Sequence, residues 1–236
     1  MRLLVTRPEP DALKLKARLE SLDHEVTVAP LMRISFANAE PVDLAEVQAV
    51  IATSRNRLRA LKAQKAHTIA ARLQLFTVGP ATAKEARLLG FELIVSGAGN
   101  GEDLVPQIVA TSDPQAGFLL LLAGDMLAYD LPRTLEAHGF RVLAPVVYRM
   151  LAATEFSEDV RDQIAMGEIE GVILLSPRTA DIYVALLAKH GLMGFAKHMT
   201  HYCLSPAIAG RLGRLGAIRS ETAAAPSLEE VLALIT

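Results

Sequence analysis

The sequence predicts an α/β protein with doubly wound parallel sheets, and three observations support this fold class. Short apolar runs that end in Ser, Thr or Gly recur along the chain, as in buried parallel strands. Each run precedes a segment in which apolar residues have helical spacing, and alternating strands and helices form parallel sheets. The order of these pieces also recurs in two parts of the chain, which indicates duplication of one α/β unit.

The predicted strands are runs of five to seven residues, which is too short for buried helices. They are rich in Leu and β-branched side chains, and six of them cover residues 2–6, 49–54, 73–79, 118–124, 171–176 and 201–205. The helices predicted after them cover residues 11–22, 56–64, 81–90, 129–139, 179–191 and 206–216. Each copy closes with a further amphipathic helix, at residues 102–110 and 227–236.

Three blocks recur in the same order in the two copies. EVTVAPLMRI after the first helix corresponds to FRVLAPVVYRM, and VIATSRNRLRAL corresponds to VILLSPRTADIYVALL, with Ser54 aligned to Ser176. In the third block Gly79 aligns with Ser205 and Gly90 with Gly216, and both pairs are 126 residues apart. A matching order of three blocks is hard to obtain from composition alone.

The duplication leaves two domain organisations open. A boundary near residues 112–117 would give two consecutive domains. In the alternative, which we favour, the chain leaves the first domain early, builds the whole second domain and returns. PLMRIS (30–35) and PVVYRM (145–150) lie where such crossings would occur, and the polar stretches after them, 36–43 and 151–159, are expected to be irregular. The domains would then be 1–33 with 152–236, and 40–143, with linker strands at 30–39 and 144–151.

Composition excludes several classes of protein. The net charge of −2 and the lack of a basic run argue against nucleic-acid binding. The first apolar run breaks at Pro8, and no run approaches the roughly 18 residues of a membrane span, so we expect neither signal peptide nor anchor. Cys203 is the single cysteine, so no disulfide or cysteine metal site is expected. We therefore expect a cytoplasmic protein, a monomer, without metal or cofactor.

The strand-to-helix turns are the candidate binding residues. Each turn alone is explained by helix capping, since Ser and Thr are good N-caps and Pro suits the first helical turn; Thr6 and Glu9 have the spacing of a capping box. Together, helix N-termini form anion sites at the carboxyl ends of the strands, and arginines adjoin three of them, with Arg57 one turn further on. The candidates are Thr6, Arg7, Ser54, Arg55, Gly79, Thr82, Gly124, Ser176, Arg178 and Ser205.

Two further features each allow more than one interpretation. The glycine-rich segment at residues 97–101 follows a strand and precedes a helix, but it lacks GxGxxG spacing and the Walker lysine, so a flexible connector is expected. Tyr148 lies in the second predicted crossing, where its phenol either packs as part of the linker or reaches into a cleft between the domains.

These residues together resemble the uroporphyrinogen-III synthase family along the whole chain. The resemblance is carried by VTRP (5–8), PLMRI, ATSRNRLRAL, VGPATAKEARLLG, PVVYRM, LLSPRTA and CLSPAIAGRLGRLG, through their order and spacing. It implies two flavodoxin-like domains joined by a two-stranded antiparallel linker, the first domain built from both chain ends. It also implies a lyase of tetrapyrrole and haem biosynthesis that closes hydroxymethylbilane, a linear tetrapyrrole with eight carboxylates, into uroporphyrinogen III.

The resemblance implies that ring D inverts through a spirocyclic intermediate, and that the bilane closes without inversion when free in solution. Tyr148 matches the family tyrosine of the second crossing, which we expect to act as an acid on the departing hydroxyl. Thr82 matches a family threonine, whereas Ala207 and Ile208 replace the threonines of the symmetric turn, so only backbone N–H groups are available there.

Two other functions remain open on the residues. A non-catalytic binding or sensor protein for a polyanionic small molecule would use the same turns, although no residues remain for an effector segment. An enzyme acting on a phosphorylated metabolite would need a glycine loop or metal carboxylates, and neither is evident in the sequence.

Overall fold

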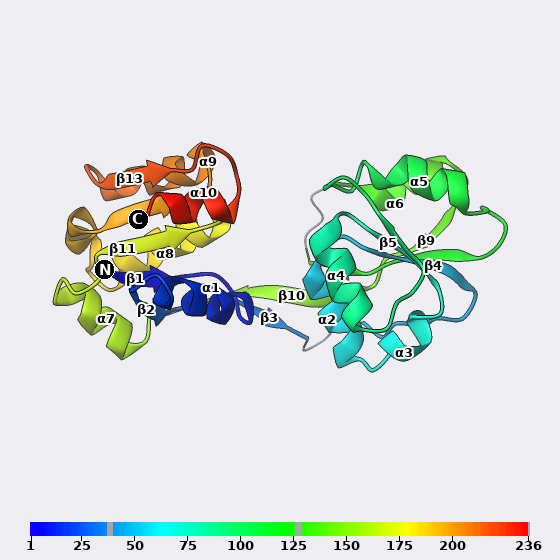
Figure 1. The fold of residues 1–236 in the computed structure, drawn as a ribbon, viewed down its shortest axis with the longest axis horizontal. Coiled ribbons are helices and arrows are strands. Elements are labelled where there is room, and N and C mark those ends of the chain that lie inside the picture. Colours follow the sequence, from blue (N-terminus) through cyan, green and yellow to red (C-terminus); the bar gives the residue numbers. More distant parts are fainter. Residues whose placement is uncertain (37–39, 126–128, 236) are drawn as a thin grey trace. The chain divides into compact units, whose positions relative to one another are not determined.

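The computed structural model describes residues 1–36, 40–125 and 129–235. The chain divides into two compact units. Unit 1 comprises Met1–Arg33 and Leu151–Thr236 and therefore contains both chain ends, and unit 2 is the continuous segment Ile34–Met150 (Figure 1). Residues 37–39, which belong to the first predicted linker strand, lie outside the described residues.

Unit 1 is built on a five-stranded sheet in the order β13-β12-β11-β1-β2, in which every pairing is parallel. The strands are β1 (Arg2–Val5), β2 (Glu25–Val28), β11 (Gly171–Leu174), β12 (Thr200–Cys203) and β13 (Arg219–Thr222). The helices are α1 (Asp11–Glu20), α7 (Glu158–Ala165), α8 (Pro177–Lys189), α9 (Pro206–Ala209) and α10 (Leu228–Ala233), with 3₁₀ segments η1 (Met193–His198) and η2 (Gly210–Leu215).

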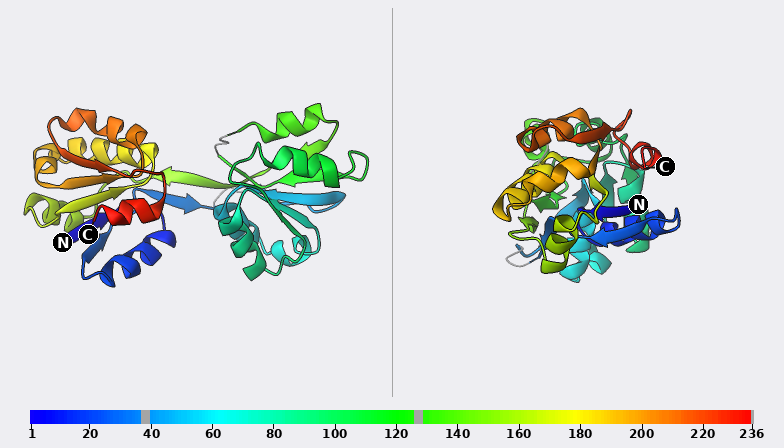
Figure 2. Two further views of the ribbon diagram at one scale, coloured as in Figure 1. Left: turned by 45° about the horizontal axis from the view of Figure 1, so that its top comes forward. Right: turned by 90° about the vertical axis from the view of Figure 1, so that its left-hand side faces the viewer.

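Helices cover both faces of this sheet (Figure 2). Leu4 and Val172 pack on one face with residues of α7 and α8, while Leu3 and Val5 pack on the other face with residues of α1 and α10. The alternation follows from the two-residue period of a strand. Helix α8 shows the matching helical pattern, because it buries Ala180, Tyr183, Val184 and Leu187 at i, i+3, i+4 and i+7.

Unit 2 has a second five-stranded parallel sheet in the order β6-β5-β4-β7-β9. Its strands are β4 (Val47–Ala52), β5 (Gln74–Thr77), β6 (Ile94–Ser96), β7 (Phe118–Leu121) and β9 (Arg141–Leu143). Helices α2 (Arg55–Ala63), α3 (His67–Ala70) and α4 (Pro80–Leu88) pack on one face, and α5 (Leu104–Thr111) and α6 (Leu131–Ala137) on the other. The prediction of an α/β fold with parallel sheets is confirmed.

The segments that run between the units lie in a third, three-stranded sheet in the order β3-β10-β8. Its strands are β3 (Met32–Ser35), β10 (Val146–Ala152) and β8 (Ala123–Gly124), and β8 pairs with β10 in parallel. The single strand predicted at residues 118–124 is therefore divided at Leu122. The amide of Leu122 still bonds to Ile51 O, whereas that of Ala123 bonds to Pro145 O, so the chain changes sheets there.

Two other predicted elements differ from the structure. The helix predicted over residues 206–216 is α for only four residues and continues as η2, because Gly210 and Gly213 in its interior disfavour an α-helix. The stretch 151–159 was expected to be irregular. Instead β10 continues to Ala152, and α7 begins at Glu158 after Ser157, whose side chain accepts a hydrogen bond from the amide of Val160.

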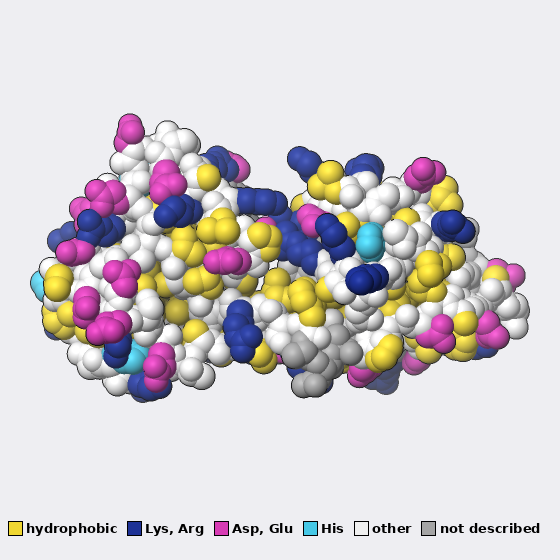
Figure 3. Space-filling model, turned by 90° about the horizontal axis from the view of Figure 1, so that it is seen from below, with side chains coloured by type: hydrophobic (Ala, Val, Ile, Leu, Met, Phe, Trp, Pro, Cys, Tyr) yellow, Lys and Arg dark blue, Asp and Glu magenta, His cyan; other side chains and the backbone are white. Residues whose placement is uncertain are grey.

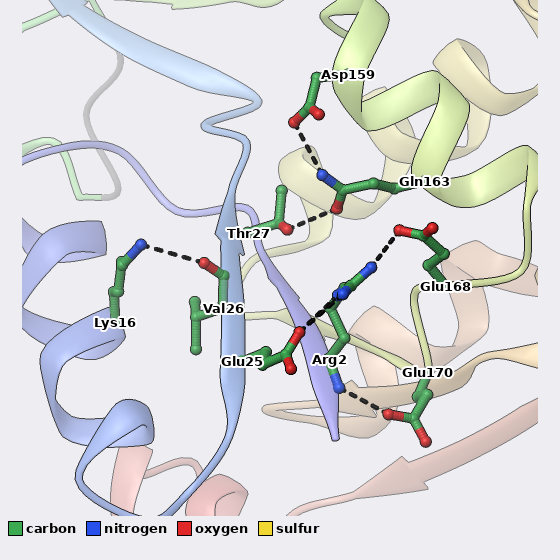
Figure 4. A network of polar contacts seen from close by, with 9 residues as sticks. All are labelled: Arg2, Lys16, Glu25, Val26, Thr27, Asp159, Gln163, Glu168 and Glu170. Atoms are coloured by element: carbon green, nitrogen blue, oxygen red, sulfur yellow. Dashed lines mark hydrogen bonds and ion pairs between the residues drawn. The ribbon is translucent and has the colours of Figure 1, made fainter.

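Charged side chains cluster at the amino ends of the unit 1 strands (Figure 4). The Arg2 guanidinium bonds to Glu25 at 2.8 Å and to Glu168, and the Arg2 amide donates to Glu170 at 2.7 Å. The interactions with Glu25 and, to a smaller extent, with Glu168 raise the pKa of Arg2. Because ligands of parallel α/β sheets bind at the carboxyl ends of strands, this exposed network stands apart from the candidate site.

Candidate functional site

The carboxyl ends of the unit 2 strands surround a pocket with a volume of about 490 Å³. Every residue that lines it belongs to unit 2. The lining residues are Thr53, Ser54, Arg57, Val78, Gly99, Asn100, Gly101, Glu102, Leu121, Tyr129, Leu131 and Tyr148. A concave site of this size, with apolar walls and a few polar groups, is typical of small-molecule binding.

The parallel topology brings these residues together. Thr53 and Ser54 follow β4, Val78 follows β5, and Leu121 ends β7, so all three turns open on one edge of the sheet. The glycine-rich loop before α5 and the β10 residue Tyr148 complete the wall. The edge at which the sequence predicted binding therefore carries the pocket in unit 2.

Tyr148 is positioned by Gly124. The two residues are register partners in the parallel pair of β10 and β8. A Cβ atom on Gly124 would lie 2.9 Å from both Cζ and the hydroxyl oxygen of Tyr148, closer than side chains tolerate. The absence of a side chain at Gly124 therefore makes room for the phenol. The prediction that Gly124 lies in a strand-to-helix turn is wrong, because it belongs to β8 and is buried.

Arg57 is a buried cation in the pocket wall. Its side chain is 5% exposed, and one guanidinium nitrogen donates to Leu122 O. Its Nε has no hydrogen-bond partner, and among the described residues no carboxylate lies within ion-pair distance of it. Burial lowers the pKa of Arg57, and the nearby Tyr148 phenol opposes this by raising it. Arginine nevertheless stays cationic at neutral pH.

Ser54 occupies the N-cap position of α2, but its side chain does not cap the helix. The Oγ atom is buried and has no hydrogen-bond partner. A buried hydroxyl without a partner is uncommon in proteins because it loses the free energy of hydration without replacement. Arg55, the first residue of α2, is partly buried and engaged in interactions of its own.

The turn before α4 adjoins the same pocket. Gly79 is the N-cap of α4 and has extended backbone, and the amide of Thr82 donates to its carbonyl at 3.1 Å. A Cβ atom on Gly79 would lie 3.8 Å from Gly99 Cα, so the turn lies next to the glycine-rich loop. Thr82 is 5% exposed. Neither Gly79 nor Thr82 lines the pocket itself.

In unit 1, the first predicted turn is occupied by interactions within the protein. The Thr6 hydroxyl donates to Ile173 O at 2.7 Å and is buried, and Arg7 pairs with Asp11 at 3.3 Å. The capping box predicted for Thr6 is wrong. Helix α1 begins at Asp11 with Pro10 as its N-cap residue, because the chain passes through the two prolines Pro8 and Pro10 before the helix starts.

The turns at Ser176 and Ser205 in unit 1 start helices as predicted, but only one of the two serines caps its helix with its side chain. Ser176 Oγ accepts from the amide of Thr179 at 3.1 Å and contacts the Thr179 hydroxyl at 2.7 Å, so it caps α8. Ser205 is the N-cap residue of the four-residue helix α9 and makes no capping bond with its side chain. Arg178, in the first turn of α8, is partly buried and has partners of its own.

Of the residues that line the pocket, only Ser54 and Tyr148 are among the predicted site residues. Arg57 lies one turn beyond the predicted cap, and its place in the buried stripe with Leu58 and Leu61 is the signal that identifies it. The glycine-rich segment, expected to be a connector, contributes Gly99–Gly101 to the wall. Tyr129 also lines the pocket, with its hydroxyl 2.9 Å from that of Thr134.

The arrangement suits an anionic organic ligand. One cation and several hydroxyl groups face a pocket whose walls include Val78, Leu121 and Leu131. Among the residues that the structure describes, no group of three His, Cys, Asp or Glu could hold a metal ion. Burial raises the pKa of Cys203 to about 11, so its thiol is unsuited to act as a nucleophile.

Charged side chains of both signs share the surface of each unit. On the face in Figure 3, Lys and Arg side chains lie among Asp and Glu side chains on each unit. Within the described part of the chain, none of the helices combines the length and hydropathy needed to cross a bilayer.

Comparisons with known proteins give consistent results. The uroporphyrinogen-III synthase from Helicobacter pylori has a similar structure, with a TM-score of 0.64 and 19% identity over 100% of this chain and 98% of that chain. A mutant uroporphyrinogen III synthase from the extremely thermophilic bacterium Thermus thermophilus gives a TM-score of 0.53 and 17% identity over 100% and 97% of the two chains. At these identities the likenesses establish the fold. No curated protein sequence matches the chain significantly.

The sequence model of one family, uroporphyrinogen-III synthase HemD, matches residues 14–233, which is nearly the whole chain. The match includes all of unit 2, all pocket residues and most of unit 1. The chain belongs to the uroporphyrinogen-III synthase family.

Proposed function

We propose that this chain catalyses the dehydrating cyclisation of hydroxymethylbilane to uroporphyrinogen III in tetrapyrrole and haem biosynthesis. The observation that carries the proposal is the unit 2 pocket, where a buried cation, an unpartnered serine hydroxyl and Tyr148 meet in a chain of this family. Such a pocket offers a carboxylate partner and an acid in one place, and the proposed reaction needs both.

The reaction asks mainly for control of conformation. In the bilane the electron-rich terminal pyrrole expels the hydroxyl group, which leaves as water after it accepts a proton. The methylene carbon left behind bonds to the substituted α-carbon of ring D, which gives the spirocyclic intermediate. The bond from ring D to its original methylene bridge then breaks and re-forms at the other α-carbon, and loss of a proton restores the pyrrole. Since the free bilane closes without inversion, the enzyme must hold the two chain ends so that the inverting closure is favoured.

We assign the proton donation to Tyr148. Its phenol lines the pocket over Gly124 and lies near the Arg57 guanidinium, so its hydroxyl is placed to donate a proton to a group bound there. Because the pyrrole supplies most of the driving force for departure, one weak acid is sufficient. Gly124 then acts by making room for Tyr148 rather than by binding substrate.

We assign the carboxylates of the substrate to the strand-to-helix turns of both units. Helix N-termini bind anions through their free N–H groups and need no cationic side chain to do so. This way of binding several carboxylates is compatible with a protein whose net charge is −2. The residues proposed for this role are Thr6, Arg7, Ser54, Arg55, Gly79, Thr82, Ser176, Arg178 and Ser205. Thr6 and Ser176 would act through their backbone, because their hydroxyls are already bonded.

We further propose that the two units are flavodoxin-like domains that arose by duplication, with residues 30–39 and 144–151 as the linker. The sheet orders support this, because β11, β1 and β2 in unit 1 take the places of β4, β7 and β9 in unit 2. Gly90 and Gly216, 126 residues apart, both have positive φ after a helical segment. We expect a monomer in the cytoplasm, without a cofactor, acting on a small molecule and not on nucleic acid or membranes.

Freshly prepared hydroxymethylbilane, with the product isomers separated by chromatography, tests the proposed function. We expect uroporphyrinogen III as the main product, at a rate above spontaneous closure. Type I product alone would refute the activity, and bilane binding without turnover would support a binding protein instead.

Tyr148→Phe tests the assignment of the acid. We expect turnover to fall by roughly tenfold to a hundredfold without being abolished, since general acid catalysis contributes about a hundredfold or more where departure is difficult. The matched control is Tyr129→Phe, which removes a pocket hydroxyl bonded to Thr134. An unchanged rate in Tyr148→Phe, or equal losses in both variants, would remove the role of Tyr148.

A further inference from the structure

We propose that Arg57 and Ser54 form a binding site for one carboxylate of the substrate, contained within unit 2. The inference rests on the proposed function and deepens it, because it assigns a charged partner to a substrate group. Arg57 follows the turn that the sequence singled out, and its side chain lines the pocket.

Arg57 carries a buried charge that no anionic group in the described part of the chain compensates. The guanidinium is 5% exposed, donates to Leu122 O, and keeps its Nε without a partner. No carboxylate of the described residues pairs with it, and Tyr148 is the one charged or titratable neighbour among them that shifts its pKa. Burial of a charge is unfavourable unless the charge is paired and hydrogen-bonded, so the ligand-free protein holds a cation that an anion in the pocket would neutralise.

Ser54 adds a hydroxyl group without a hydrogen-bond partner to the pocket that Arg57 lines. Ser54 Oγ is buried and unpartnered, and Ser54 lines the same pocket as Arg57. Ser54 precedes the nine-residue helix α2, so a ligand at this end also meets the positive end of the helix dipole. A guanidinium donor and a hydroxyl donor at a helix start together match the two oxygens of a carboxylate.

The rest of the pocket wall is largely apolar and leaves room for an organic ligand. Val78, Leu121 and Leu131 line the pocket, whose volume of about 490 Å³ far exceeds that of a simple anion. The site therefore suits a carboxylate carried on an apolar ring, such as a pyrrole with an acidic side chain, rather than inorganic phosphate. Glu102 is exposed and lies at the same pocket, which disfavours ligands with several charges close together.

Three variants test this site. Arg57→Met removes the charge and keeps much of the stem, Arg57→Lys keeps the charge, and Arg87→Met removes an exposed charge in the last turn of α4. KM and kcat with hydroxymethylbilane, the Kd of uroporphyrinogen III by anoxic calorimetry, and the urea unfolding of the ligand-free protein are measured for each. For Arg57→Met we expect KM and Kd to rise by roughly tenfold to a hundredfold with kcat changed much less.

Arg57→Lys should recover most of the lost affinity, and Arg87→Met should behave as the unmutated protein. Ligand-free Arg57→Met should be at least as stable as the unmutated protein, because an unpaired buried charge is removed. Unchanged KM and Kd, or a loss of stability without a change in Kd, would overturn the inference and leave Arg57 as a structural partner of Leu122. If the unmutated protein forms only type I product, the proposed function fails, while the calorimetric titration still decides whether Arg57 binds a polycarboxylate.

Discussion

The two units use the same turn in different ways. After β11 in unit 1, Ser176 and Thr179 bond to each other and close the start of α8. After β4 in unit 2, Ser54 has the corresponding position but no partner, and Arg57 occupies the place that corresponds to Thr179. Both residues at this place are buried, at 4% and 5% exposed. The same position therefore completes a cap in one unit and leaves a charge and a hydroxyl open in the other.

This difference separates a turn whose side chains stabilise the start of a helix from a turn whose hydrogen-bonding groups are left open. A capped helix start gains about 1 kcal/mol, whereas an open start with a buried cation loses free energy until a ligand binds. Functional sites commonly break the local rules that the rest of a protein obeys. The unit 2 turn breaks two of them and lies in a pocket, and the unit 1 turn breaks neither.

The largest effect that we expect concerns the packing of Tyr148 in unit 2. In Gly124→Ala the new methyl group would lie 2.9 Å from the phenol, so the ring must move. We expect turnover to fall on the order of a hundredfold, because a shift of about 1 Å in a positioned group can cost that much. The rate of uroporphyrinogen III formation is the measurement.

Gly194→Ala serves as the control in unit 1, since no atom lies within 4 Å of its Cβ position. If both variants retain full activity, the contact between Gly124 and Tyr148 does not matter for catalysis. The difference between the unit 2 edge and its unit 1 counterpart would then depend on Arg57 and Ser54 alone.

The second effect is the loss of stability or of substrate affinity when Ser176 or Ser54 is replaced by alanine. Ser176→Ala should lower the free energy of unfolding by about 1 kcal/mol, the usual cost of losing a cap. Ser54→Ala should cost close to nothing in the ligand-free protein, because its hydroxyl makes no bond there, but should raise KM severalfold. Urea unfolding and steady-state kinetics are measured on both, and equal losses of stability would show that Ser54 also caps its helix.

The smallest effect concerns η2, the 3₁₀ segment of unit 1 that follows α9 in place of the predicted α-helix. Gly213→Ala should stabilise the protein by about 0.5–1 kcal/mol and raise its helicity, since Ala favours a helix interior and the Cβ position is open. Thermal unfolding and far-ultraviolet circular dichroism check this. Gly216→Ala, at a φ of +74°, should instead destabilise, and stabilisation by both substitutions would contradict the conformational explanation.

Much of the fold could be predicted from the sequence because local signals agreed with the tertiary structure. The run 171–176 is apolar without interruption up to its closing serine, since β11 is buried on both faces. The split of 118–124 between two sheets could not be foreseen, because it depends on a bond between Ala123 and Pro145 that no local pattern encodes. Gly210 and Gly213 indicate that the helix predicted over residues 206–216 is broken. The helical spacing of the apolar residues in the same segment indicates the opposite, so the break was not predicted.

The candidate site could be predicted only in part, because residue type shows which groups can bind a ligand but not which of them are already bonded within the protein. Ser54 and Tyr148 were identified from turn chemistry and family likeness, and both line the pocket. The bonds that occupy Thr6 and Ser176 depend on neighbours in space, so residue type alone overstated how open these hydroxyls are. Arg57 is not among the predicted site residues, because an arginine near a helix start is usually solvated. Its place on the helix face of Leu58 and Leu61 is the sequence signal for the burial that the structure shows.

The interleaved path of the chain also bears on how the protein forms on the ribosome. Residues 1–33 contribute only β1, α1 and β2 to unit 1, and β1 pairs with β11, which begins at Gly171. Translation at about 5–20 residues per second leaves roughly ten to thirty seconds before that partner emerges. During this interval unit 2 can fold whole, while Leu3, Leu4 and Val5 of the nascent chain stay uncovered, so chaperone demand should fall on the amino-terminal segment.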